Sequence, residues 1–135
     1  MPVRHVHPRQ TETFEVIQGN LKIECSGTIR VLGPGETFTV AKGKPHQWWN
    51  SADDKDLEMR VTMTPARNWE TQMEQVFGIM NAKGKLSFLQ IMAMANTYEM
   101  YVAGPPLPLQ KIMSFLLYPL ARLKGIKEYY PEFSR

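Results

Sequence analysis

The stretch of sequence that decides the fold reads HVHPRQTETFEVIQG and covers residues 5–19. It places two histidines one residue apart, and residues i and i+2 of a β-strand point to the same face. His5 and His7 can therefore direct two imidazoles to one point. Glu12 follows His7 after four residues, which is enough chain to turn a corner and bring a carboxylate back to the pair.

The remaining histidine of the chain, His46, lies in a second informative stretch, GETFTVAKGKPHQWWN, residues 35–50. We expect it to arrive from a later strand that crosses the same cavity. Three neutral nitrogens and one anionic oxygen suit a divalent first-row metal, and Fe, Mn, Ni, Co and Zn all accept this donor set. The sequence thus predicts a metal site without fixing the metal.

The two stretches carry the spacings of a known family. The first reads H-x-H, four residues, Glu12, six residues, Gly19, and the second reads G, five residues, A-x-G, two residues, H, three residues, N. Both resemble the motifs of the cupin superfamily, except that Ala41 stands where the family has proline. The resemblance implies a mainly β fold, a cupin-type jelly-roll β-barrel, with His5, His7, Glu12 and His46 as metal ligands and two coordination positions left for water, substrate or dioxygen.

The start of the chain is short for this family. Only four residues precede His5, whereas cupin domains normally have further strands there. Three explanations remain open: a preceding segment lies outside this sequence, a partner chain supplies the missing strands, or the barrel closes with fewer strands and leaves an edge to be covered.

Polarity patterns divide the chain into a β half and a helical half. Alternation bounded by glycine and proline predicts strands at 12–18, 21–25, 29–32, 37–40, 47–50 and 57–63. After Pro65 the period becomes helical, with helices expected from Asn68 as N-cap to Gly84, over 86–101 and over 108–124, where Pro119 should kink or end the helix. We therefore expect residues 1–65 to form the cupin core and residues 66–135 to form a helical extension like that of small bacterial cupins.

Strand alternation also selects pocket candidates. Counting along the strand from Glu12 puts Phe14 and Val16 on the ligand face and Glu15 on the opposite face. On the later strand, Trp48 lies on the same face as His46, and Trp49 lies on the other. Packing remains an alternative role for Trp48. Cys25 shares parity with core positions, which predicts a buried and inert thiol. The predicted pocket residues are Phe14, Val16, Trp48, Met59 and Met63.

Composition excludes several classes of protein. The 135 residues carry a net charge of +3, from 16 basic and 13 acidic groups without a dense basic cluster, so we expect no nucleic-acid partner. A single cysteine and the lack of a signal-peptide pattern favour the cytoplasm. The longest charge-free apolar stretch, 112–121, is about half of the roughly 20 residues that a spanning helix needs.

The helical extension is apolar with a basic end, and two interpretations stay open. The first, which we expect, packs the helices on the barrel and across a homodimer interface. The second is contact with a membrane surface, with Phe115, Leu116, Leu117 and Leu120 in the headgroup region and basic residues near anionic lipid.

The function expected from this site is that of a metal-dependent enzyme with Fe(II)-type, dioxygenase-like chemistry on a small organic molecule. Apolar pocket candidates favour an aromatic or other apolar substrate. The alternatives are a metal-dependent isomerase or decarboxylase and a non-catalytic small-molecule or metal-binding sensor. After the four ligands are set aside, no histidine remains as general acid or base.

Overall fold

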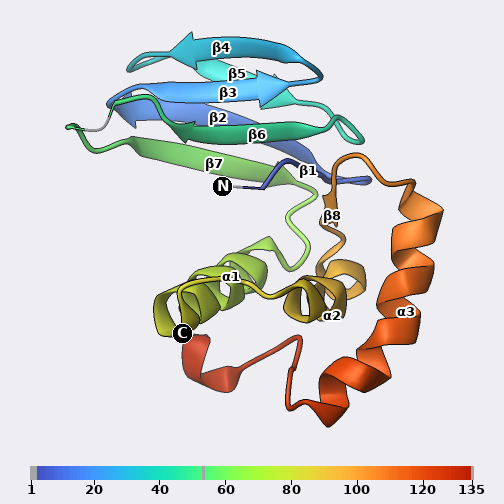
Figure 1. Cartoon of the computed structure of the whole chain (residues 1–135). Helices are drawn as coiled ribbons and strands as arrows, with labels where there is room; N and C mark the ends of the chain where they lie inside the picture. Colours follow the sequence, from blue (N-terminus) through green and yellow to red (C-terminus); the bar gives the residue numbers. More distant parts are fainter. Residues whose placement is uncertain (1–2, 53, 135) are drawn as a thin grey trace. The chain divides into compact units, whose positions relative to one another are not determined.

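The structure, a computed structural model, describes residues 3–52 and 54–134. The chain divides into two compact units, with the boundary between Ala66 and Arg67. The first unit is built from β-strands and the second mainly from helices, and we describe each by itself (Figure 1).

Antiparallel strands make up the first unit. One sheet contains the neighbouring strands β4-β3-β6-β1, and a second sheet has the strand order β5-β2-β7 (Figure 1). The predicted strands begin and end within one residue of those observed. The bounds are β1 His5–Val6, β2 Thr11–Gln18, β3 Leu21–Cys25, β4 Thr28–Leu32, β5 Thr37–Val40, β6 His46–Asn50 and β7 Glu58–Thr64.

Strand β2 shows how alternation builds the core. Glu12, Phe14 and Val16 are almost fully buried, while the residues that alternate with them, Thr11, Thr13 and Glu15, are only half-buried. In the pairing with β7, Glu12 lies opposite Met63, Phe14 opposite Val61 and Val16 opposite Met59. The alternation of residues 57–63 predicts that Leu57, Met59, Val61 and Met63 face the core, and this is confirmed, since Met63 is buried and the other three pack against the core.

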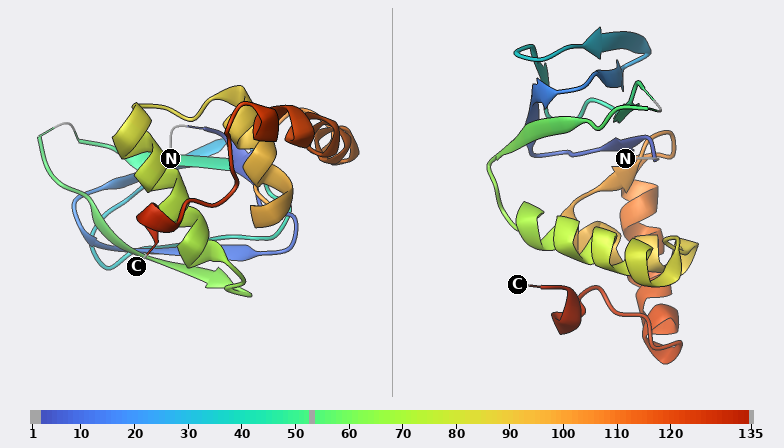
Figure 2. Two further views of the ribbon diagram at one scale, coloured as in Figure 1. Left: turned by 90° about the horizontal axis from the view of Figure 1, so that it is seen from below. Right: turned by 90° about the vertical axis from the view of Figure 1, so that its left-hand side faces the viewer.

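The second unit holds three α-helices (Figure 2). Helix α1 ends at Gly84, which takes a left-handed φ of 74°. Helix α2 begins after Ser87, whose side chain accepts a hydrogen bond from the backbone N–H of Gln90, and α2 packs on α3. The bounds are α1 Trp69–Lys83, α2 Phe88–Tyr98, β8 Tyr101–Val102, α3 Leu107–Leu123 and the 3-10 helix η1 Pro131–Phe133.

The predicted end of the second helix is wrong, and two other details of the helices need comment. Asn68 is the N-cap residue of α1, as predicted, but it makes no capping hydrogen bond, and its side-chain amide donates to the carbonyl of Thr97. Helix α2 stops at Tyr98, because Glu99 takes a left-handed φ of 52°. Pro119 does not end α3, which continues to Leu123. The carbonyl that loses its partner there belongs to the strongly exposed Phe115, so water can satisfy it.

The buried face of α1 also differs from the predicted one. The helical spacing of apolar residues predicts that Trp69, Met73, Val76, Phe77 and Met80 form one buried face, but Phe77 is 48% exposed. Two glutamines, Gln72 and Gln75, are buried instead. The amide of Gln75 donates to the carbonyl of Tyr130 at 3.0 Å and accepts from its N–H at 2.6 Å. These bonds allow a polar side chain to be buried on the helix.

No helix within residues 3–52 and 54–134 is long and apolar enough to cross a bilayer.

Candidate metal centre

Four buried side chains of the first unit converge on one point. His5 lies on β1, His7 directly after it, Glu12 on β2 and His46 on β6, and each is at most 2% exposed. Antiparallel pairing of β1 with β6 places His5 directly opposite His46. Each residue offers a ligand atom within 4.8 Å of those of the other three. The structure therefore brings together all four residues that the sequence predicted as ligands.

The carboxylate of Glu12 lies among the imidazoles. Its Oε2 is 2.7 Å from Nε2 of His46 and 3.7 Å from Nε2 of His7. The ring centroids of His5 and His46 are 4.3 Å apart, and those of His5 and His7 are 4.9 Å apart. Groups so close in a dry interior need a shared cation or proton to offset the cost of burying them.

Backbone carbonyls orient two of the rings. Nδ1 of His5 lies 2.9 Å from the carbonyl oxygen of Val3, and Nδ1 of His46 lies 3.1 Å from that of Lys44. A carbonyl can only accept, so Nδ1 donates in both rings and the lone pair is left on Nε2. Such an outer hydrogen bond is typical of metal-binding histidines.

The residues fit a divalent metal. Nε2 of His5 is buried and has no hydrogen-bond partner among the residues that the structure describes. A buried lone pair without a partner carries a desolvation cost. A metal ion held by three imidazoles and one carboxylate would satisfy this atom and would neutralise the buried charge of Glu12.

Burial also sets the charge state of the imidazoles. Desolvation, reinforced by His46, lowers the pKa of His7 from 6.5 to about 3. The pKa of His5 is held well below 6.5, first by desolvation and then by His46 and His7. Both rings are therefore neutral near pH 7, which is the form that binds metals.

The predicted pocket residues lie in the core on the ligand side of the sheets. Phe14 and Val16 are buried, and the ring of Trp48 packs edge-on against Phe14 with the centroids 6.1 Å apart. Met63 lies opposite Glu12, and Met59 lies four pairs further along β7, opposite Val16. All five residues belong to or pack against the apolar core of the first unit, and their contact with a substrate stays a prediction.

Three other sequence predictions concern single side chains. Glu15 points away from the site, as predicted, and forms an ion pair of 2.8 Å with Arg60 on β7. Trp49 also faces away, with the ammonium of Lys22 over its ring at 5.6 Å. Cys25 is half-buried rather than buried, because it is the last residue of β3 before an exposed turn. That part of the cysteine prediction is wrong.

The sequence analysis did not predict two side-chain contacts made by residues close to the candidate ligands in the sequence. Gln10, which lies between His7 and Glu12 in the sequence, is buried. Its side-chain amide donates to the carbonyls of Pro65 and Ala66 at 3.1 and 3.2 Å. Arg4 pairs with Glu24 at 2.7 Å, and this hydrogen bond lowers the pKa of Glu24. Both contacts join residues far apart in sequence, so no local pattern could have shown them.

The strand architecture, the buried cluster and a comparison of the sequence with known protein families together identify the family. Residues 1–63 match the family model of the cupin domain. These residues are a cupin domain. The architecture of the chain is accordingly a cupin-type β fold followed by a helical extension.

Relatives of this cupin include curated oxidoreductases. An oxidoreductase of Arthrobotrys oligospora is 26% identical over 152 residues, which cover 98% of this chain and 59% of the relative. The oxidoreductase macE of Penicillium terrestre is 30% identical over 122 residues, covering 77% of this chain and 46% of the relative. This cupin therefore spans about half the length of the curated relatives it matches.

A solved structure with a similar sequence is that of KdgF from Halomonas sp. It is 26% identical and has a TM-score of 0.38, covering 43% of this chain and 52% of the other.

Proposed function

We propose that this cupin is a metal-dependent oxidoreductase that acts on a small organic molecule. The observation that carries the proposal is the buried cluster of three imidazoles and one carboxylate, with ligand atoms within 4.8 Å of one another. The oxidoreductases among its relatives support the reaction class.

His5, His7, Glu12 and His46 would hold the metal, with Fe, Mn, Ni, Co and Zn as candidates. Bound Fe(II), the candidate we favour, would supply the electron transfer that dioxygenase-like chemistry requires. The protein contributes three imidazoles, two of which are oriented by the carbonyls of Val3 and Lys44. Their pre-set orientation means that little reorganisation is needed when a ligand binds.

The surroundings of the cluster favour an apolar substrate. Phe14, Val16, Trp48, Met59 and Met63 are predicted on the same side of their strands as the ligands, and all five belong to or pack against the apolar core. All three histidines of the chain belong to the cluster, so no further imidazole is available as general acid or base. This favours redox chemistry on an aromatic or similar molecule over isomerisation.

Two carboxylates of β2 provide a matched test. Glu12 is buried in the cluster, whereas Glu15 lies on the other face of the same strand. Removing a group that only hydrogen-bonds to a metal ligand typically lowers metal affinity by roughly 10–100-fold. Glu12 is a candidate ligand itself, so we expect Glu12→Gln to lower the affinity at least as much. Glu15→Gln should bind metal like the unchanged protein. Elemental analysis and Fe(II) titration under anaerobic conditions measure both.

Oxygen consumption by the Fe(II)-loaded protein tests the reaction. A panel of small aromatic and aliphatic compounds should include one that stimulates oxygen uptake, and Glu12→Gln should abolish that stimulation. A protein that binds no metal, or the same loss in both variants, would contradict the metal site. Tight metal binding without oxygen uptake would contradict an oxygen-dependent reaction and leave the isomerase, decarboxylase or sensor interpretations.

A further inference from the structure

Helix α3 carries a broad apolar face that the other described elements of the second unit leave exposed. Its inner side is buried through Gln110, Ser114 and Ala121. On the outer side, Phe115 is 76% exposed and Leu123 is 85% exposed. The exposed apolar side chains of this outer face are Leu109, Ile112, Phe115, Leu116, Leu120 and Leu123.

The outer face contains no polar side chain. At about 100° per residue, these six residues and the exposed prolines 108 and 119 occupy an arc of about 140°. Leu117, which the sequence interpretation placed on this face, is half-buried toward the inner side. Ile112 and Leu123 belong to the face instead.

Basic residues border the face. Lys111 and Arg122 lie along one edge, Lys124 follows the last turn, and all three are exposed. Residues 105–127 contain no Asp or Glu. Arg122 is 3.9 Å from Glu128, a distance at which the pair contributes little. The exposed charge along α3 is thus entirely positive.

We propose that the outer face of α3 binds the surface of a bilayer that contains anionic phospholipid. The apolar arc would enter the boundary between headgroups and acyl chains, while the basic side chains reach the phosphates. Pairing of α3 with α3 of a second copy fits less well, because it would bring these cations together with no acidic residue between them. Charge complementarity therefore favours lipid.

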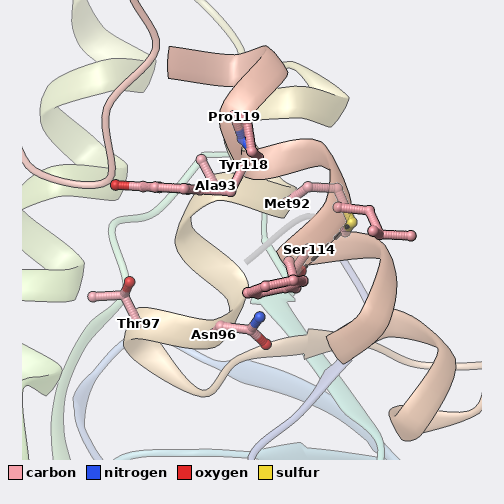
Figure 3. A pocket seen from close by; sticks show the side chains of 9 residues that line it. Met92, Ala93, Asn96, Thr97, Ser114, Tyr118 and Pro119 are labelled. Carbon is pink, nitrogen blue, oxygen red and sulfur yellow. Dashed lines mark hydrogen bonds between the residues drawn. The ribbon is translucent and has the colours of Figure 1, made fainter.

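An apolar hollow opens on the same face. It lies between α2 and α3, has a volume of about 370 Å³, and is lined by Met92 and Ala93 from α2 and by Phe115, Leu116 and Pro119 from α3, among others (Figure 3). Three of its lining residues belong to the outer face or its arc, so an inserted face would place this hollow next to the acyl chains. It adds apolar surface for lipid to cover.

Co-sedimentation of the full chain with vesicles tests the proposal. Binding is expected to vesicles of phosphatidylcholine with phosphatidylserine, to be weaker without phosphatidylserine, and to fall as salt is raised. The double variant Phe115→Ser/Leu123→Ser should lose binding. Ile29→Ser, which changes an exposed apolar residue of β4, is the matched control and should bind normally. Circular dichroism confirms that each variant is folded.

Substitutions of the basic residues beside the apolar face test the contribution of charge separately. Arg122→Gln and Lys124→Gln should each lower the partition coefficient about fivefold. Lys85→Gln, an exposed cation before α2, should lower it much less. Absence of binding to anionic vesicles would overturn the proposal, as would equal losses in the control variants. A dimer that Phe115→Ser/Leu123→Ser dissociates, without lipid binding, would show that a second copy covers the face instead.

Discussion

Burial of the histidines has opposite effects on metal binding and on stability. Inside the cluster, His5 and His7 have pKa values lowered mainly by desolvation, which keeps the rings neutral and ready to bind. In the unfolded chain the same rings regain an ordinary pKa near 6.5. The unfolded state therefore binds more protons in mild acid than the folded state does.

Metal-free protein should consequently lose stability as pH falls below about 6.5. The loss continues down to about 3, the folded pKa of His7. Each of the two histidines lowers the folding equilibrium constant by up to about tenfold per pH unit in this window. Urea unfolding of the chelator-treated protein at several pH values measures the slope.

His7→Gln is the variant that isolates this effect. It removes one group with a lowered pKa, so the slope below pH 6.5 should become shallower. A slope unchanged by His7→Gln would mean that His7 is not the buried neutral ring described above.

At the level of elements, the strands could be predicted and the helix faces could not. Glycine and proline mark the turns of the first unit, and the alternation around Phe14 and Met63 depends only on neighbouring residues. Spacing likewise pointed to the four candidate ligands, because each motif lies within one short stretch. The buried glutamines of the helices depend on remote partners, such as Tyr130 for Gln75 and the carbonyl of Lys127 for Gln90. Hydrophobic periodicity does not register such hydrogen bonds.

Gly78, in the middle of α1, shows how a helix can depend on a remote segment. Alanine in a helix interior is normally more favourable than glycine by about 1 kcal/mol. Here a β-carbon at position 78 would collide with the ring of Phe133 in η1. Gly78→Ala should therefore lower the thermal midpoint, whereas in a Phe133→Ala background the same change should raise it. A higher midpoint in both backgrounds would show that Phe133 does not pack there.

Over the whole chain, the candidate metal site and the apolar face of α3 lie in different units. All four candidate ligands lie in the first unit, before Ala66, whereas α3 belongs to the second. Each unit also has a buried core of its own, with Phe14, Leu21 and Ile23 in the first and Val76 and Ile79 in the second. A ligand that binds only the folded state of one unit stabilises that unit directly.

Metal removal should therefore act unevenly along the chain. At a free metal concentration about 1,000 times the dissociation constant, binding stabilises the folded first unit by about 4 kcal/mol. Hydrogen exchange followed by mass spectrometry should show that amides of β2, β3 and β6 lose protection when a chelator is added. Amides of α1 and α2 should change little, because their cores contain no ligand. Glu12→Gln provides the control, because added metal should no longer restore the hydrogen-exchange protection of β2, β3 and β6 in this variant. An equal loss of protection in strands and helices would instead mean that the two units unfold as one cooperative structure, in which metal bound near His46 stabilises the helices as strongly as the strands.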